Sequence, residues 1–347
     1  MIFPKKTVNV FLPLMMAGML AKDSLAETTN AATVTNGVIA PASEKASPKA
    51  VAEEDSPKNM QGLRIAAPAG MTIEWDVAYL AEERKEKADL YLPTNTPAGK
   101  LCPAILIMHG GGFNDGDKAR PREINFCTNL AARGYVCMSI NYKLSRPEAR
   151  DKATWPQCVY DAKTAVRWLR KNAARMQIDP ERIGAMGGSA GGNLAAMLAT
   201  TDAKDGLEGD GPYQEFSTKV KCAVDFYGAV KLLEYHDMKM FSKTRAEAPE
   251  LYEKGSPVNY VTKGDAPMLI SHGSADKMVN VSQSEALVDA FKKAGVEVEF
   301  LVVPDGPHTY NLNPKQKDMR PAVFAFLDKY LKRADPVAPR ITRTNVQ

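Results

Sequence analysis

Residues 187–191 read Gly-Gly-Ser-Ala-Gly and place a single serine, Ser189, among small neighbours. The run before it, residues 182–186, is mostly apolar and predicts a buried strand, while residues 193–198 are good helix formers. A serine on a sharp turn from strand to helix exposes its hydroxyl, and the strained backbone of such a turn favours glycine. The pattern predicts a nucleophilic serine, with a flexible turn or an anion-binding nest as the alternative.

Residues 109–112 read His-Gly-Gly-Gly and follow an apolar run that ends at Met108. Consecutive glycines leave backbone N–H groups free of neighbouring side chains, which suits the binding of a negatively charged oxygen. A mobile hinge is the alternative interpretation. A phosphate-binding loop is disfavoured because no Lys-Ser or Lys-Thr pair follows at the required spacing.

The segments around these motifs alternate between strand-like and helix-like patterns. Residues 71–79 and 87–92 predict an opening antiparallel pair of strands. Nearly continuous apolar runs predict strands covered on both faces at residues 104–108, 135–140, 182–186, 220–226, 267–271 and 296–303. Amphipathic helices are expected at residues 123–133, 159–175, 192–200, 282–293 and 317–332. This alternation predicts an α/β fold with a mostly parallel central sheet and helices on both faces.

With these elements in place, the two glycine motifs together resemble the α/β-hydrolase fold, and specifically secreted carboxylesterases of the acetylxylan and feruloyl esterase type. Three shorter matches support the resemblance, which spans residues 75–331: Gly-Asp-Lys at 116–118, Asp-Ala-Lys at 161–163 and His-Gly-Ser-Ala-Asp at 272–276. The resemblance implies a serine esterase with a small cap or insertion.

A serine esterase needs a base, and the chain has four histidines. His308 follows the last expected strand, in the position where this fold carries the catalytic imidazole, in the order Ser, Asp, His. His109 belongs to the glycine loop, and the resemblance implies a structural role in bracing it. His236 lies in an irregular stretch, and His272 ends a strand and is expected to pack beneath the site.

Two aspartates are candidates for the acid that orients His308. Asp276 follows the expected strand 267–271, so its carboxylate can reach an imidazole on the next loop. Asp225, near the end of the preceding strand, is the competitor because some hydrolases carry the acid there. Asp305 is disfavoured since it precedes the histidine by only three residues.

The expected reaction follows from these roles. His308, held by Asp276, removes the proton from Ser189 as the serine attacks an ester carbonyl. Backbone N–H groups of Gly111, Gly112 and Ala190 are expected to bind the oxyanion. The alcohol leaves first and water then releases the acid. No metal and no organic cofactor is expected.

The ends of the chain differ from its body in composition. Lys5 and Lys6 precede an apolar run at residues 8–20, and the small residues Ser24 and Ala26 complete the pattern of a signal peptide over 1–26, which predicts a secreted or periplasmic protein. Residues 27–62 predict a disordered linker, 63–334 the catalytic domain and 335–347 a flexible tail. A net charge of +4 on 347 residues gives no reason to expect nucleic acid as a partner, and no stable membrane insertion is expected after cleavage.

Five cysteines occur without metal-ligand spacing, which argues against a zinc site. They are Cys102, Cys127, Cys137, Cys158 and Cys222. Cys137 and Cys222 lie in apolar runs and are expected in the core. The first disulfide to test is Cys127 with Cys158, because each lies in or beside an expected helix.

The substrate is less closely defined than the chemistry. Residues 202–216 and 231–256 are expected as insertions over the strand ends, where a lid or substrate wall lies. Four aromatic residues there or nearby either stack on a sugar or phenolic acid or pack the insertion: Tyr227, Tyr235, Phe241 and Tyr252. We expect acetyl or feruloyl esters on plant polysaccharide. The alternatives are small soluble esters, a serine peptidase of the prolyl-oligopeptidase type, and a binding module without catalysis.

Overall fold

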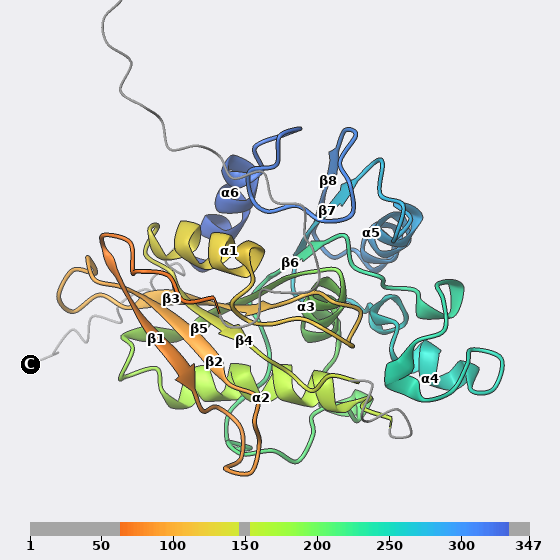
Figure 1. Ribbon diagram of the computed structural model, residues 1–347, viewed down its shortest axis with the longest axis horizontal. Helices are drawn as coiled ribbons and strands as arrows, with labels where there is room; N and C mark the ends of the chain where they lie inside the picture. Colours follow the sequence, from red (N-terminus) through yellow and green to blue (C-terminus); the bar gives the residue numbers. More distant parts are fainter. Residues whose placement is uncertain (1–62, 146–152, 333–347) are drawn as a thin grey trace, which may run out of the picture. The chain divides into compact units, whose positions relative to one another are not determined.

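The computed structural model describes residues 63–145 and 153–332. Its strands are β1 (Met71–Val77), β2 (Ala88–Pro93), β3 (Cys102–Met108), β4 (Val136–Ile140), β5 (Ile178–Gly188), β6 (Ala223–Phe226), β7 (Met268–Gly273) and β8 (Val298–Val303). They form one sheet in the order β1-β2-β4-β3-β5-β6-β7-β8 (Figure 1). Among these strands, β2 alone runs in the opposite direction to the others, so that β1–β2 and β2–β4 are antiparallel pairs and the remaining pairs are parallel. The expected α/β fold with a mostly parallel sheet is confirmed.

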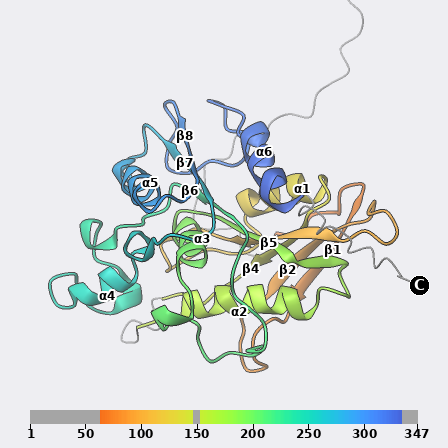
Figure 2. The same ribbon diagram turned by 180° about the vertical axis from the view of Figure 1, so that it is seen from behind.

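Helices cover both faces of this sheet. They are α1 (Pro121–Ala131), α2 (Gln157–Lys171), α3 (Ala190–Thr200), α4 (Pro249–Lys254), α5 (Ser282–Ala294) and α6 (Arg320–Leu331). The buried side chains of α1 and α6 share one core cluster, and those of α2, α3 and α5 share another. Figures 1 and 2 show α1 and α6 together on one side and α2 on the other. Every residue of β3, β4, β6 and β7 is buried, which explains their continuous apolar runs.

Three elements differ most from the sequence prediction. Helix α2 ends at Lys171, whereas the prediction extended to residue 175, because residues 172–177 form turns. β5 begins at Ile178, whereas the prediction began at residue 182, because Ile178 already pairs with Cys102. The turn residues Asp179 and Pro180 lie within an irregularity, after which pairing resumes between Ala104 and Ile183. Helix α4 was not predicted. It has six residues and a single buried one, so it is too short to show a helical period.

Residues 202–216 do not lie over the carboxyl ends of the strands, contrary to the expectation. They connect the end of α3 to the start of β6, and parallel β5 and β6 put that start at the amino edge of the sheet. Glu208 anchors the segment on α2, where it accepts hydrogen bonds from Lys163 and Arg167, each at 2.6 Å. This segment is therefore remote from the edge where Ser189 lies.

Residues 231–256, by contrast, follow the carboxyl end of β6 and stay at that edge. The side-chain amide of Asn193 on α3 donates to the carbonyls of Ala229 and Gly255 at 2.8 and 3.1 Å and holds the two ends of the segment. Within the segment Phe241 and Tyr252 are fully buried and pack on each other, as one of the two interpretations expected. Tyr235 is only partly buried.

The cysteines are all free and buried, so Cys127 and Cys158, the first pair to test for a disulfide, are not joined. Cys127 on α1 and Cys158 on α2 belong to different core clusters, on opposite faces of the sheet. The sequence could not reveal this separation because both helices show similar amphipathic patterns. Cys137 and Cys222 lie in the core as predicted.

The expected signal peptide, linker and tail lie outside the described residues. Across residues 63–145 and 153–332, no helix combines the length and apolar character needed to cross a bilayer.

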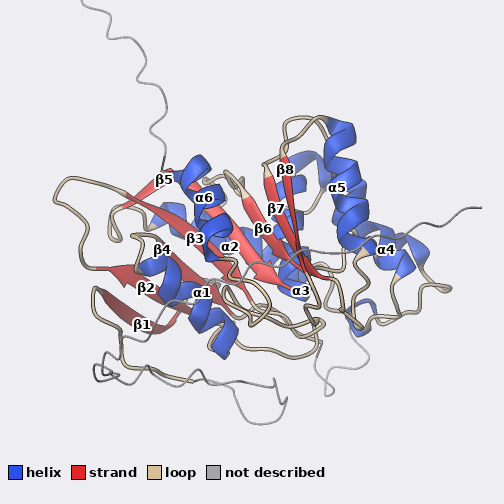
Figure 3. Cartoon of the chain, turned by 90° about the horizontal axis from the view of Figure 1, so that it is seen from above, coloured by secondary structure: helices blue, strands red, loops and turns tan. Residues whose placement is uncertain are grey.

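Seen from above, the strands fan across the molecule between the two helical layers (Figure 3). Because the strands from β3 to β8 run parallel, the loops after β3, β5, β7 and β8 leave the sheet at one edge, where the candidate site residues lie.

Candidate active site

Ser189 occupies a strained turn between β5 and α3. Its φ is 57° and its ψ is −119°, a conformation that side chains rarely adopt. The flanking glycines are required for space. A Cβ at Gly191 would lie 2.0 Å from the carbonyl oxygen of Met108, and one at Gly187 would lie 2.3 Å from that of Gly191. The Ser189 N–H donates to the carbonyl of Phe226 at 2.8 Å, which fixes the elbow to β6.

The structure brings Ser189, His308 and Asp276 into one hydrogen-bonded line. His308 Nε2 lies 3.0 Å from Ser189 Oγ, and His308 Nδ1 lies 2.7 Å from Asp276 Oδ2. The Asp276 side chain is fully buried and that of His308 is 12% exposed. The three residues come from the loops after β5, β7 and β8, as their order in the sequence required. Such a line can pass the serine proton to the imidazole.

Four donors hold the Asp276 carboxylate in place. The backbone N–H groups of Met278 and Val279 donate to Oδ1 at 2.8 and 2.9 Å, while the two imidazoles, His308 and His272, share Oδ2. Burial alone raises the pKa of this carboxyl, but the bonds from His272 and His308 outweigh it and hold the pKa well below its usual range. Asp276 is therefore an anion next to His308.

His272 packs beneath the site, as expected, and its tautomer is defined by its neighbours. Its Nδ1 lies 2.6 Å from Ser284 Oγ, and its Nε2 lies 2.9 Å from the carbonyl of Val279 and 3.1 Å from Asp276 Oδ2. Both acceptors sit on the Nε2 side, so Nε2 carries the proton and Nδ1 accepts from the serine hydroxyl. His272 thus ties Asp276 to α5.

Asp225, the competing acid, makes no hydrogen bond to His308. Its Oδ1 accepts from the Gly228 N–H at 2.8 Å, and its Oδ2 has no partner among the described residues. Burial raises the pKa of Asp225 to about 7. Of the two aspartates, only Asp276 meets the imidazole.

The raised pKa of Asp225 predicts a pH-dependent effect of its replacement on stability. Asp225 stays protonated in the folded protein to about pH 7 but ionises near pH 4 when unfolded, so the wild type loses stability between these values as the pH rises. Asp225→Asn lacks this loss. From pH 5 to pH 8 we expect its free energy of unfolding, relative to wild type, to increase by about 2 to 3 kcal/mol.

Urea unfolding of both proteins at pH 5 and pH 8 measures this difference, and the same change at the exposed Asp305 controls for loss of a surface carboxylate. If the difference in free energy of unfolding between Asp225→Asn and wild type is the same at pH 5 and pH 8, the pKa of Asp225 is not raised in the folded protein.

His109 braces the glycine loop from inside. It is fully buried, its Nδ1–H donates to the Gly110 carbonyl at 2.7 Å, and its ring stacks on Tyr142 at 4.4 Å. Burial lowers its pKa to about 4, so the ring is neutral. Gly116 closes the loop over it, since a Cβ there would lie 2.1 Å from His109 Nδ1. These contacts give His109 the structural position that the resemblance implied.

The backbone N–H groups expected to bind an oxyanion are free within the described part of the chain. Those of Gly111, Gly112 and Ala190 donate to no described residue. Gly111 and Gly112 have φ values of 120° and 60°, which turn the loop away from the strand direction after β3. Ala190 is the first residue of α3, where a backbone N–H lacks a partner within the helix.

Sequence reasoning missed Arg122, which lies behind both glycine motifs. Its Nη1 donates to Tyr227 Oη at 3.1 Å, although the two residues are far apart in the sequence. The available signal was a cation in the first turn of a helix, where the helix dipole disfavours positive charge. Tyr227, considered as a stacking residue, is fully buried instead.

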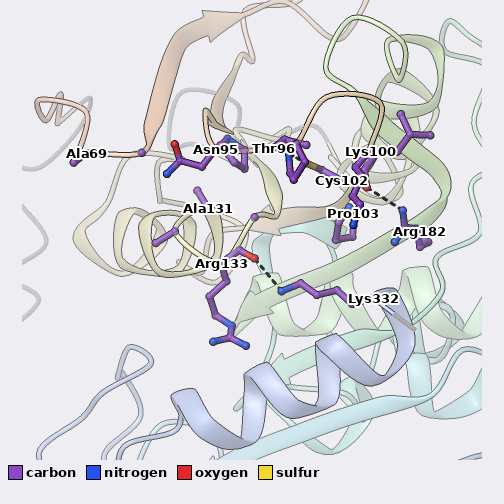
Figure 4. A pocket seen from close by; sticks show the side chains of 16 residues that line it. Ala69, Asn95, Thr96, Lys100, Cys102, Pro103, Ala131, Arg133, Arg182 and Lys332 are labelled. Carbon is purple, nitrogen blue, oxygen red and sulfur yellow. Dashed lines mark hydrogen bonds between the residues drawn. The ribbon is translucent and has the colours of Figure 1, made fainter. Parts of the chain in front are cut away.

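A cavity of about 700 Å³ lies at the opposite, amino edge of the sheet (Figure 4). Three of the four cations that line it have carboxylate partners: Arg133 and Lys332 pair with Asp328, and Arg182 pairs with Asp179, while the fourth cation is Lys100. No group of three or more His, Cys, Asp or Glu side chains suited to a metal ion occurs in the described ranges. The arrangement that can do chemistry is therefore the one around Ser189.

The sheet order, the serine elbow after β5 and the acid and histidine after β7 and β8 define an α/β-hydrolase. The chain belongs to the BD-FAE family, whose model matches residues 88–291.

Several known proteins similar to this chain carry esterase names. Esterase LipQ of Mycobacterium tuberculosis is 30% identical over 248 residues, which cover 68% of this chain and 57% of LipQ. A truncated carbohydrate esterase from gut microbiota superimposes with a TM-score of 0.67 at 27% identity, covering 76% of this chain and 97% of that one. For propionate-bound Est2 of Thermogutta terrifontis the TM-score is 0.61 at 26% identity, with coverages of 76% and 94%. The chain spans little more than half the length of its most similar curated relatives.

Proposed function

We propose that this protein hydrolyses carboxylic esters through an acyl-enzyme on Ser189. The observation that carries the proposal is the line from Ser189 Oγ to His308 Nε2 at 3.0 Å and from His308 Nδ1 to Asp276 Oδ2 at 2.7 Å. Membership of the BD-FAE family and the esterase names of its relatives support it.

In the proposed mechanism His308 takes the proton from Ser189 as the hydroxyl oxygen attacks the ester carbonyl. The Asp276 anion stabilises the imidazolium and keeps the proton on Nδ1, so that Nε2 faces the serine. The free N–H groups of Gly111, Gly112 and Ala190 bind the tetrahedral oxyanion. The imidazolium then protonates the leaving alcohol, and water repeats the sequence to release the acid and free serine.

We further propose acetyl or feruloyl groups on plant polysaccharide as the substrates. The similarity to a carbohydrate esterase supports this choice. The basic start and apolar run of residues 1–26 support export, which brings an enzyme to polymeric substrates. A small soluble ester is the second candidate, and the likeness to a propionate-bound esterase supports it.

Initial rates on matched substrates distinguish these candidates. We expect hydrolysis of acetylated or feruloylated xylan with kcat/KM at least about tenfold above that for methyl ferulate and for nitrophenyl esters of short fatty acids, since remote binding energy favours the polymeric substrate. A peptide nitroanilide with a free amino terminus serves as the peptidase control. Turnover of the nitrophenyl esters alone favours the small soluble ester, whereas preferred turnover of the anilide contradicts the esterase proposal.

A further inference from the structure

Arg122 is a buried cation in an unfavourable position. It is the second residue of α1, its side chain is 9% exposed, and the helix dipole opposes a positive charge there. Burying a charge costs stability unless partners compensate for the lost water. A cation retained at such a place therefore needs an explanation beyond packing.

Each of the three guanidinium nitrogens donates to a partner. Nε and Nη2 donate to the buried carboxylate of Glu123 at 2.8 and 2.6 Å, and Nη1 donates to Tyr227 Oη at 3.1 Å. The ion pair neutralises the charge. The planar guanidinium group is held in one orientation because it bonds Glu123 on α1 and Tyr227 after β6.

The same guanidinium lies against the backbone of both glycine motifs. A Cβ at Gly110 would lie 2.9 Å from Arg122 Nη2, and a Cβ at Gly188 would lie 3.2 Å from its Cζ and Nη1. The Gly110 Cβ would also lie 2.8 Å from the Gly188 carbonyl oxygen and 3.2 Å from Ser189 Cβ. The glycine loop and the serine elbow thus contact each other directly, with Arg122 behind the contact.

Tyr227 extends the contact to the histidine loop. Its hydroxyl donates to the Tyr310 carbonyl at 2.9 Å and accepts from the Tyr310 N–H at 3.3 Å and from Arg122. The Tyr227 hydroxyl thereby uses its single proton and both of its lone pairs in hydrogen bonds. Its ring lies 4.9 Å from that of His308, two residues before Tyr310. Glycine loop, serine elbow and histidine loop all meet the pair formed by Arg122 and Tyr227.

We propose that Arg122 is a positioning residue that, through Tyr227, holds the oxyanion-binding loop, Ser189 and His308 in the geometry of the transition state. This inference rests on the proposed ester hydrolysis. Since these contacts reach Ser189, the glycine loop and the histidine loop, loss of Arg122 is expected to lower kcat and to leave KM nearly unchanged.

Steady-state kinetics of Arg122→Met on nitrophenyl acetate test this proposal. We expect kcat to fall by about 100-fold with KM within threefold of wild type, and the rate of fluorophosphonate labelling to fall in parallel. Arg122→Lys keeps the charge but lacks the fork, so it restores part of kcat. The matched control is Arg167→Met, which also removes a buried arginine from a carboxylate partner but on α2, remote from the serine. It is expected to lower the melting temperature with kcat within twofold of wild type.

Tyr227→Phe is the second variant, for the case in which Arg122→Met does not fold. It removes the hydroxyl that joins Arg122 to the histidine loop, and kcat is expected to fall about tenfold at unchanged KM. The proposal is overturned if whichever of the two variants folds keeps kcat within twofold of wild type, or if Arg167→Met loses as much kcat as Arg122→Met. Ser189→Ala, measured alongside, separates this failure from failure of the proposed function, because only the latter leaves that variant active.

Discussion

Replacing Ser189 with alanine is expected to lower kcat for ester hydrolysis by about 10⁴- to 10⁶-fold. The substitution removes the only hydroxyl that meets His308 Nε2 in the described structure, so no acyl-enzyme can form. Residual turnover then depends on the free N–H groups of Gly111, Gly112 and Ala190 acting on a water molecule. Alanine fits the elbow as well as serine does, and the folded state is expected to persist.

Two measurements check this result. Hydrolysis of nitrophenyl acetate gives kcat, and intact-mass analysis after fluorophosphonate treatment gives the number of labelled serines. Wild type should take up one label and Ser189→Ala none. Ser282→Ala at the exposed start of α5 is the matched control, with the same change in side chain and full activity. Retained turnover in Ser189→Ala, or a label on another serine, would falsify the proposed mechanism.

Much of this site could be predicted from the sequence because catalysis restricts both residue type and place. A nucleophile at a strand end needs small neighbours because a larger side chain would clash with the adjacent backbone. A Cβ at Gly191, for example, would lie 2.0 Å from the carbonyl oxygen of Met108. The same restriction applies to the position of Asp276 and His308 on loops after successive strands. The strands could be predicted as well. Because β3 and β7 are buried on both faces, each appears in the sequence as a continuous apolar run.

Other features depend on distances that a linear pattern does not contain. Arg122 reads as an ordinary charged residue near a helix start, and its role becomes visible only when Tyr227 folds beside it. Residues 202–216 were expected over the strand ends, but the length of α3 carries them to the amino edge. Cys127 and Cys158 lie on opposite faces of the sheet, which local periodicity cannot express.

The choice between the two candidate acids leads to the second large expected effect. Asp276→Asn is expected to lower kcat/KM for nitrophenyl acetate by about 10³- to 10⁴-fold. The same substitution at Asp225 is expected to leave kcat/KM within about threefold of wild type, because that carboxyl is protonated below about pH 7 and does not bond His308. A pair of isosteric changes, one on β6 and one on the loop after the neighbouring strand β7, thus compares the two positions directly.

The size of the effect at Asp276 follows from its four donors. The backbone N–H groups of Met278 and Val279 cannot become acceptors, so the amide oxygen of an asparagine must face them. The amide NH₂ group then faces His308, and Nδ1 has to accept a hydrogen bond where it now donates one.

An imidazole that accepts a hydrogen bond at Nδ1 carries its proton on Nε2, the nitrogen that faces Ser189. Nε2 then has no lone pair to take the serine proton. Asp276→Asn should therefore remain folded and bind substrate while losing both turnover and fluorophosphonate labelling. A larger loss in Asp225→Asn than in Asp276→Asn would assign the acid to β6. In the proposed mechanism, the tautomer of His308 that the Asp276 anion fixes is what makes Ser189 a nucleophile.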